Sequence, residues 1–393
     1  MKTNISKASD IIQSALTFGI NPSLAPMQRI CELLGNPQEK FTCIQVAGTN
    51  GKSSTSRYLA AILQSFGHRT GLYTSPELIS YAERIEIEGR PVDEESFARA
   101  IIHVDATAKE DALDLTEFEL ITAAGLWLFA ENKMEYVVLE VGLGGRWDAT
   151  TVVHPKLAVL TGVDLDHTSV LGNTITEIAQ EKIAVLEEST ILVMAPTHVE
   201  AMQVFKEYAG TTHSPVFEVP LAVTQEENSY QAQNKLTALT AARALLLPNT
   251  FDQEAAIQAI NNTIIPGRLE TLHNNPLLII DAAHNPASAH MLAQTLDISE
   301  YVLLLGVLAD KDATGIIEVL CFQPLEIVVT QSSSPRAIPA DELAVLVEKI
   351  SGRTPQVFQT PKDALAVLLK QDNPIVATGS ITLAGEVKRE FQS

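Results

Sequence analysis

The sequence predicts an α/β fold with mainly parallel sheets, divided between two domains. Apolar, β-rich runs alternate with amphipathic helical patterns along almost the whole chain of 393 residues. Such alternation is typical of strand–helix–strand units. Many of the runs are continuously apolar, as expected when helices cover both faces of a sheet. The chain is also too long for one typical domain and about right for two or three.

The expected strands and helices follow in order. Strands are expected at 41–47, 69–75, 135–142, 156–163, 190–196, 277–283, 301–307, 325–331 and 374–380. Helices are expected from Lys52 onward and at 93–109, 116–131, 174–187, 231–247, 339–350 and 361–370. Pro266 and Gly267 interrupt this pattern, and a new strand–helix series starts at Leu277. We therefore expect domains of residues 1–266 and 267–393.

Composition argues against several classes of protein. The net charge of −21 disfavours a basic face for nucleic acid. The longest apolar stretch, "LITAAGLWLFA", is too short to span a bilayer, and the N-terminus lacks an apolar signal core. Cys31, Cys43 and Cys321 are odd in number and far apart, which favours buried, reduced thiols. We expect a soluble, cytoplasmic monomer that contacts neither nucleic acid nor membrane.

The stretch "VAGTNGKSSTS" indicates a phosphate-binding loop between a strand and a helix. Position 46 is valine, so the strict G-x-x-x-x-G-K-[ST] pattern fails, but Gly48 and Gly51 let the backbone curl around an anion. A helix from Lys52 would point its positive end at the loop. Lys52 adds a mobile charge, and Ser53 or Ser54 can reach a metal ion. The alternative is an ordinary strand-to-helix turn with a surface lysine.

Polar clusters follow several expected strands, where ligands bind in parallel sheets. Glu140 ends one strand and is followed by glycines that permit close approach. A carboxylate from Glu140 and a hydroxyl from Ser75 suit magnesium. His167 ends "DLDH" and is a less usual ligand, for which a surface histidine is an equal alternative. Lys182, judged by composition alone, is a helix-surface lysine.

Two other enzyme classes find no support. There is no G-x-S-x-G nucleophile elbow and no G-x-G-x-x-G after a strand. In the second domain Asp281, His284 and Asn285 form a polar cluster, and Arg268 stands at the domain junction, where it could contact a nucleotide phosphate.

These motifs, in this order, resemble the folylpolyglutamate synthase/dihydrofolate synthase family, in the wider group of Mur-type amide ligases. The resemblance covers nearly the whole chain. It is carried by "QVAGTNGKSST", "LYTSPELISYAERIEIEG", "VLEVGLGGRWDATTVV", "DLDHTSVLGNTITEIAQEK", "YQAQNKLTAL", "PGRLE", "DAAHNPASA", "GVLADKD", "SSPRA" and "GSITLAGEVKR", with "FGINPSLAPMQRICELLGNPQ" ahead of them. It implies a P-loop ATPase domain joined to a smaller Rossmann-like α/β domain, with ATP in the cleft.

The resemblance also assigns roles by position. Lys52, Lys182 and His167 match catalytic positions, and Lys182 matches a lysine that the family carbamylates to provide an extra anionic ligand. Magnesium would be held by Ser75, Glu140 and His167. The positions that match ATP contacts are Gly48, Thr49, Asn50, Gly51, Lys52, Ser53, Ser54, Asn234, Arg268, Asp281 and His284.

The chain departs from the family pattern at four places. Ser53 replaces a glycine, Glu77 stands where the family usually has histidine, and Thr151 where it usually has asparagine. After Lys182 the chain reads "IAVLEE" instead of "AGIIK". We expect the changes at positions 77 and 151 to affect the pterin side more than ATP binding.

The implied reaction is an ATP-dependent ligation. A carboxylate of dihydropteroate or tetrahydrofolate would attack the ATP γ-phosphate, and the amine of L-glutamate would then displace phosphate from the acyl phosphate. The first alternative is a Mur ligase of cell-wall synthesis, although the 47 residues before Gly48 are few for the nucleotide-sugar domain of such enzymes. The second is a nucleotide-binding protein without catalysis, against which Lys52, Glu140 and His167 argue.

Overall fold

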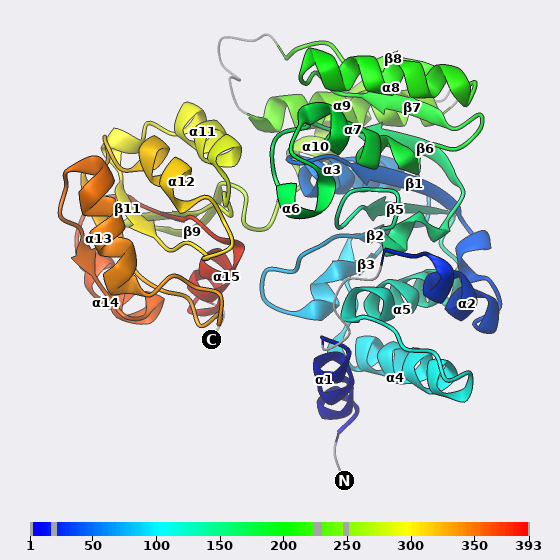
Figure 1. Ribbon diagram of the computed structural model, residues 1–393, viewed down its shortest axis with the longest axis horizontal. Coiled ribbons are helices and arrows are strands. Elements are labelled where there is room, and N and C mark those ends of the chain that lie inside the picture. Colours follow the sequence, from blue (N-terminus) through cyan, green and yellow to red (C-terminus); the bar gives the residue numbers. More distant parts are fainter. Residues whose placement is uncertain (1–2, 17–21, 223–229, 247–250, 392–393) are drawn as a thin grey trace. The chain divides into compact units, whose positions relative to one another are not determined.

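The computed structural model describes residues 3–16, 22–222, 230–246 and 251–391 (Figure 1). The chain separates into two compact units. Unit 1 comprises Met1–Ala222 and Gln231–Thr263, and unit 2 comprises Val223–Tyr230 and Ile264–Ser393. The α/β class predicted from the sequence is confirmed in both units, each of which contains a mostly parallel sheet with helices.

The described part of unit 1 contains an eight-stranded sheet in the order β4-β3-β2-β5-β1-β6-β7-β8. Its strands are β1 (Thr42–Ala47), β2 (Thr70–Tyr73), β3 (Ile85–Ile87), β4 (Arg90–Pro91), β5 (Tyr136–Glu140), β6 (Pro155–Leu160), β7 (Ile191–Met194) and β8 (Val216–Glu218). The strands from β2 to β8 in this order run parallel, whereas the pairings β2–β3 and β3–β4 are antiparallel. Since β1 lies between β5 and β6 and runs parallel to both, the segments that follow these three strands lie side by side at the carboxyl ends of the strands.

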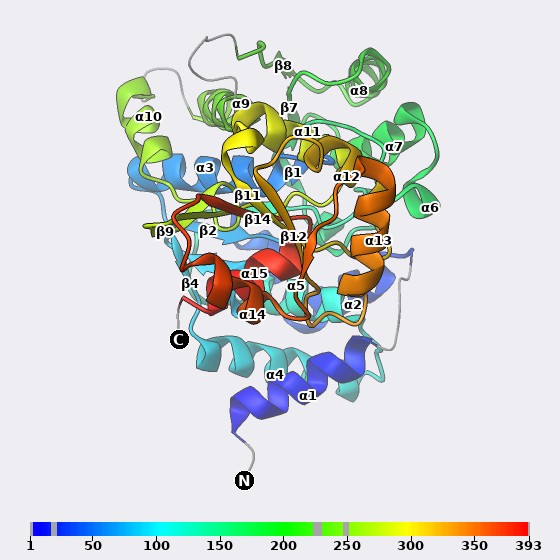
Figure 2. The same ribbon diagram turned by 90° about the vertical axis from the view of Figure 1, so that its left-hand side faces the viewer.

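Helices pack against this sheet through large apolar clusters. The helices are α1 (Asn4–Ala15), α2 (Ala25–Leu33), α3 (Lys52–Ser65), α4 (Glu94–Glu110), α5 (Glu117–Glu131), α6 (Thr168–Leu171), α7 (Ile175–Lys182), α8 (Val199–Thr211), α9 (Tyr230–Leu245) and α10 (Gln253–Asn261). One cluster joins α1, α2, α4 and α5 to β1, β2 and β5, and another joins α7 and α8 to β6 and β7. Figure 2 shows α1 lying along α4.

The described part of unit 2 contains a six-stranded sheet in the order β13-β12-β11-β14-β10-β9, antiparallel only between β9 and β10. Its strands are β9 (Glu270–Asn274), β10 (Leu277–Ile280), β11 (Val302–Leu305), β12 (Glu326–Val329), β13 (Gln356–Val357) and β14 (Ile375–Thr378). Its helices are α11 (Pro286–Thr295), α12 (Ala313–Leu320), α13 (Ala340–Ser351), α14 (Pro361–Leu368) and α15 (Ile381–Arg389). Short 3-10 helices occupy Pro37–Glu39, Tyr81–Arg84, Ala149–Val152, Ile183–Val185 and Ile298–Glu300.

All nine expected strands are present, and the described strands that were not expected lie at or next to the edges of the sheets: β3, β4, β8, β9 and β13. The helix expected at 174–187 is shorter. The α-helix α7 ends at Lys182, and a 3-10 helix follows at Ile183–Val185. The backbone carbonyl of Glu181 accepts a hydrogen bond from the N–H of Arg146, so a loop satisfies the end of the helix. The helix expected at 231–247 is α9, and residue 247 lies outside the described residues.

All three cysteines are free and buried, as the sequence predicts. Cys31 lies in α2, Cys43 in β1, and Cys321 directly after α12. Burial raises the pKa of the Cys31 and Cys321 thiols to about 12 and that of Cys43 further. Among the described residues, no helix has the length and apolar character needed to cross a membrane.

Candidate active site

The loop between β1 and α3 requires glycine at two positions. Gly48 has φ +155°, and a Cβ there would lie 1.8 Å from Thr161 Oγ1. Gly51 caps α3 with φ +84°, where a Cβ would lie 2.4 Å from Asn234 Oδ1. Side chains rarely tolerate such backbone angles and such approaches. The backbone conformation and close packing of the predicted phosphate loop therefore require glycine at both positions.

Residues after β6 hold the loop by hydrogen bonds, and the loop leads directly into α3. Thr49 donates its N–H to the Gly162 carbonyl (2.7 Å), and its hydroxyl accepts from the N–H of Asp164 (3.0 Å). Lys52 Nζ donates to the Thr49 carbonyl (3.1 Å). The first turn of α3 has no acidic residue and no side-chain cap. The positive end of the helix, with Lys52, thus suits an anion such as phosphate.

Glu140, the last residue of β5, is 1% exposed and faces this loop. Its Oε1 accepts from the Ser53 hydroxyl (2.7 Å), and its Oε2 accepts from the Ser75 N–H (3.2 Å). Burial raises the pKa of the Glu140 carboxyl, and the charge of Lys52 opposes that rise. The Ser75 hydroxyl is also buried and has no hydrogen-bond partner within the described part of the chain. Two of the three expected metal ligands therefore lie together.

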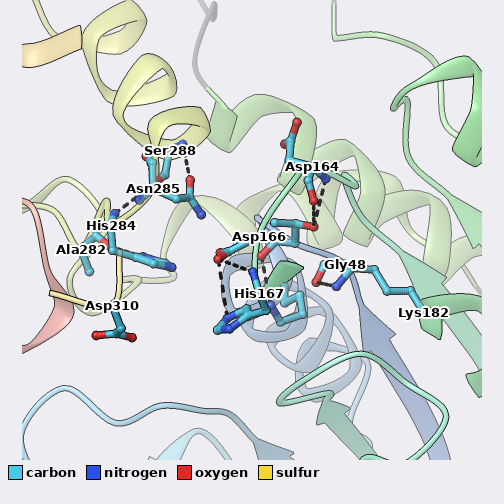
Figure 3. Close-up of polar contacts among 12 residues, drawn as sticks. Gly48, Asp164, Asp166, His167, Lys182, Ala282, His284, Asn285, Ser288 and Asp310 are labelled. Atoms are coloured by element: carbon cyan, nitrogen blue, oxygen red, sulfur yellow. Dashed lines mark hydrogen bonds and ion pairs between the residues drawn. The ribbon is translucent and has the colours of Figure 1, made fainter. Parts of the chain in front are cut away.

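His167, the third expected metal ligand, is half-exposed and caps α6. Its N–H donates to Asp166 Oδ1 (2.8 Å), and its ring Nε2 lies 3.9 Å from the same oxygen (Figure 3). The φ of +51° is uncommon for a non-glycine residue. In the described residues no group of three His, Cys, Asp or Glu side chains could hold a metal by itself. Magnesium bound with a nucleotide needs only one or two carboxylates, because phosphates and waters complete its shell.

Lys182 is buried, so its interpretation as a helix-surface lysine is wrong. It ends α7 with 4% exposure, and its Nζ donates to the Gly48 carbonyl at 2.8 Å (Figure 3). Burial, with a smaller effect of the Lys52 charge, lowers the pKa of Lys182 to about 7. Its neighbour Glu181 instead accepts from Arg146 Nε (3.0 Å).

Helix α9 brings amide side chains to the same loop. Asn234 lies against Gly51, and its Nδ2 is buried without a hydrogen-bond partner among the residues described. Gln231 Nε2 donates to the Ser54 hydroxyl (3.3 Å), and its Oε1 accepts from the Tyr58 hydroxyl (3.1 Å). The sequence-predicted Asn234 thus joins the loop residues in unit 1, whereas Ser54 turns toward α9.

The remaining predicted residues lie in unit 2. Asp281 follows β10 and is 2% exposed. Its carboxylate accepts from the Tyr230 hydroxyl, the Leu269 N–H and the Ala283 N–H, each at 2.9 Å. Burial raises the pKa of Asp281, and the charge of Arg268 opposes this. His284 Nδ1 contacts the Ala282 carbonyl (2.9 Å), and its N–H donates to Ser288 Oγ (Figure 3).

Unit 1 also holds a cavity of about 560 Å³ that the sequence did not indicate. Its walls come from α1, α5, α6, α7 and the segment after β5. The lining residues are Ala15, Leu16, Pro22, Thr116, Glu117, Phe118, Glu119, Gly142, Leu143, Gly144, Gly145, Trp147, Asp148, Ala149, Val170, Leu171 and Glu181. The available signal was "EVGLGGRWDA", whose glycines follow Glu140 directly.

The cavity combines apolar and acidic groups. Leu16, Trp147 and Val170 line the cavity and are each more than half exposed, so they form an exposed apolar surface. Asp148 is buried, and its Oδ1 accepts from the N–H and hydroxyl of Thr150. Burial raises the pKa of Asp148.

Two of the departures from the family pattern are explained by contacts near this cavity. Glu77 pairs with the buried guanidinium of Arg84, whose Nη2 lies 3.1 Å from Glu117 Oε1 on the cavity wall. Thr151 donates to the Gly145 carbonyl (2.8 Å) and accepts from the buried amide of Gln45 (3.2 Å). Each substituted residue is therefore integrated into local polar contacts.

Comparison with known proteins agrees with this arrangement. Residues 46–244 match the Mur ligase middle domain, and residues 267–381 match the Mur ligase glutamate ligase domain. The dihydrofolate synthase/folylpolyglutamate synthase of Bacillus subtilis is 31% identical over the full length of both chains. The chain belongs to the dihydrofolate synthase/folylpolyglutamate synthase family.

Solved structures of this family share the fold. Mycobacterium tuberculosis folylpolyglutamate synthase complexed with ADP has a TM-score of 0.90 and 28% identity, covering 99% of this chain and 98% of that one. The Yersinia pestis bifunctional folylpolyglutamate synthase/dihydrofolate synthase, complexed with AMPPNP and manganese, has a TM-score of 0.89 and 27% identity, covering 100% and 99%. Family members thus bind adenine nucleotides, and one is known with a divalent metal.

Proposed function

We propose that this chain is an ATP-dependent ligase that adds L-glutamate to the carboxylate of a pteroate or folate. The observation that carries the proposal is that a phosphate loop and an organic-ligand cavity adjoin the same strand end. Glu140 ends β5 at the loop, and Gly142 and Gly145, a few residues later, line the cavity. Activation of a carboxylate by ATP needs these two sites next to each other.

The cavity suits the pteridine end of the acceptor. A pteridine is a flat aromatic ring with amino and N–H donors. Phe118 and Trp147 provide aromatic surface, while Glu119 and Asp148 provide carboxylate acceptors. Binding would cover the exposed apolar wall of Leu16, Trp147 and Val170, which supports a ligand of this class.

The loop suits the triphosphate of ATP. The backbone of Gly48, Thr49, Asn50 and Gly51 and the start of α3 surround the phosphate position, and Lys52 would move from the Thr49 carbonyl to the phosphates. Ser53, Ser54 and Asn234 complete this set. We keep the division between residues 266 and 267 as the functional domain boundary.

The residues present fit magnesium. The Ser75 hydroxyl is buried without a partner in the described chain, beside a carboxylate that two donors hold in place. Ser75, Glu140 and His167 would hold the ion. Magnesium, when bound, would neutralise charge on the phosphate oxygens. Oxygen-rich donors of this kind are those that a hard cation prefers.

Lys182 is suited to carbamylation. A lysine must be neutral before its nitrogen can attack carbon dioxide, and a pKa of about 7 leaves a large neutral fraction at neutral pH. Addition of carbon dioxide forms an N–C bond and releases one proton. The resulting carbamate anion would stand beside the Gly48 carbonyl and the charge of Lys52.

The reaction would follow two displacements. An acceptor carboxylate oxygen attacks the γ-phosphorus and ADP leaves, which gives an acyl phosphate. The glutamate amine then attacks the acyl carbon, phosphate leaves, and the nitrogen loses a proton. Lys52 and the α3 N-terminus would stabilise charge on the transferred group, which is the main requirement in phosphoryl transfer.

We further propose that the protein acts as a cytoplasmic monomer without nucleic-acid partners. The net charge of −21 supports the last point, and three buried free thiols suit a reducing compartment.

The test is ADP release measured with dihydropteroate and tetrahydrofolate, each with and without L-glutamate. We expect release that depends on both an acceptor and glutamate. Release that needs neither would leave a nucleotide hydrolase, and a requirement for a cell-wall precursor would replace the folate assignment.

A further inference from the structure

Ser53 stands at the position of the strict P-loop's serine or threonine. In the strict P-loop, a serine or threonine directly follows the lysine and contacts magnesium. In this chain Ser53 directly follows Lys52. The residue lies in the first turn of α3, so its position is fixed by the helix.

The contacts of Ser53 direct it to the expected metal position. Its Oγ donates to Glu140 Oε1 at 2.7 Å, while the other carboxylate oxygen accepts from the Ser75 N–H at 3.2 Å. The next residue, Ser54, instead accepts from Gln231 Nε2. Of these two serines, Ser53 is thus the one that faces Glu140.

The spacing of the oxygens suits shared ligation of one ion. Magnesium binds oxygens at about 2.0–2.1 Å in an octahedron, which separates adjacent ligand oxygens by about 3.0 Å. Ser53 Oγ and Glu140 Oε1 are 2.7 Å apart, so a small shift would place both on one ion. The Ser75 hydroxyl, buried and without a partner in the described chain, lies on the residue that holds the other carboxylate oxygen.

We propose that the Ser53 hydroxyl is a direct ligand of the nucleotide-bound metal, in addition to Ser75, Glu140 and His167. The proposal rests on the ATP and metal part of the proposed function and is independent of the acceptor. Ser53 would exchange its hydrogen bond to Glu140 for a bond from its oxygen to the ion.

The first experiment measures manganese binding to the full chain with ADP by electron paramagnetic resonance, without acceptor or glutamate. Ser53→Gly and Ser53→Ala should each raise the manganese Kd about tenfold. Ser56→Ala is the matched control, because Ser56 lies in the same helix with a buried hydroxyl that has no partner among the described residues. An unchanged Kd in both Ser53 variants overturns the proposal.

A second variant separates ligation from positioning. In Ser53→Cys the oxygen becomes sulfur, and thiolates prefer soft ions. Direct ligation predicts that the cadmium Kd falls relative to Ser53→Ala while the manganese Kd stays raised. A cysteine variant with the same cadmium affinity as the alanine variant would show that Ser53 only orients Glu140, and would overturn the proposal. Thermal melts of all variants check the fold, and ADP binding alone checks the nucleotide site.

Discussion

Two buried carboxylates, Glu140 in unit 1 and Asp281 in unit 2, stand at equivalent places. Each lies at or just after the end of a parallel strand, each is at most 2% exposed, and burial raises the pKa of both. Their partners differ. Glu140 accepts hydrogen bonds from one side-chain hydroxyl and one backbone N–H. The hydroxyl of Ser75, which provides that N–H, is buried and has no hydrogen-bond partner among the described residues. Asp281 accepts three hydrogen bonds that tie Tyr230, Leu269 and Ala283 to its own strand end.

This difference separates two uses of the same chemical group. A carboxylate whose acceptors are engaged by backbone N–H groups stabilises a loop, because removing it would leave those donors unsatisfied. A carboxylate held by one backbone N–H and by one hydroxyl that can turn away remains able to bind a cation. Burial and a shifted pKa alone do not distinguish the two.

The largest effect is expected from the phosphate loop itself. Lys52→Ala should lower ATP turnover by about 10²–10³-fold, since it removes the charge at the α3 N-terminus. Measurement of kcat for ADP release tests this, with a thermal melt to show that the fold persists. Lys109→Ala, which affects an exposed lysine in α4, is the control. Near-normal turnover would remove the basis for the phosphate loop.

The next prediction compares the two carboxylates directly. Glu140→Gln should raise the metal concentration needed for half-maximal activity about 10–100-fold while leaving the melting temperature unchanged or higher, because it removes a buried charge. Asp281→Asn should instead cost about 1–3 kcal/mol of stability, because an amide donor would oppose N–H donors. Metal titration and denaturant unfolding measure both properties. The reverse pattern would contradict our distinction between the two sites.

Lys182→Ala should reduce kcat about tenfold or more, and added acetate should restore part of it, because a free carboxylate can replace a carbamate. The pKa of Lys182 is lowered to about 7, so its neutral, reactive form increases as the pH rises through 7. In the native chain, activation by bicarbonate should therefore grow over that range. Lys206→Ala, an exposed lysine paired with Glu218, is the control. A lack of rescue and of bicarbonate dependence would leave Lys182 an uncarbamylated amine.

The smallest effect is expected at the acceptor cavity. Glu77→His restores the family residue and removes one of two carboxylates around Arg84. The ratio of kcat/KM for tetrahydrofolate over dihydropteroate should rise about threefold, because tetrahydrofolate carries an additional carboxylate. Glu88→Gln, which affects an exposed pair with Arg69, is the control. An equal change in this kcat/KM ratio in both variants would show that the ion pairs of Arg84 do not influence acceptor choice.

The parts of the site that come from contiguous sequence could be predicted. The motif around Gly48, Gly51 and Lys52 is enough to predict a phosphate-binding loop. Glu140 could be selected because it ends an apolar strand and is followed by glycines. The nine principal strands were recognisable because they are continuous apolar runs. The strands β3, β4, β8 and β13 were not, because two or three residues carry no periodic pattern, and β9 was not, because its residues 270–274 are not an apolar run.

Long-range contacts set the remaining features. Lys182 is buried because it reaches the carbonyl of Gly48, 134 residues earlier, and no local pattern contains that contact. The cavity joins side chains from Ala15 to Glu181, so its volume exists only after the sheet and helices assemble. The hydrogen bond from Ser53 to Glu140 likewise joins residues 87 positions apart.

The buried cysteines offer a way to follow the motions of each unit. A buried thiol with a raised pKa reacts with alkylating reagents only after its surroundings open. Cys43 lies in the strand that leads into the phosphate loop, whereas Cys321 lies in unit 2. Their labelling rates, measured by mass spectrometry, would therefore report local unfolding of each unit separately. Slower labelling of Cys43 in the presence of ADP would show that the nucleotide stabilises the sheet of unit 1.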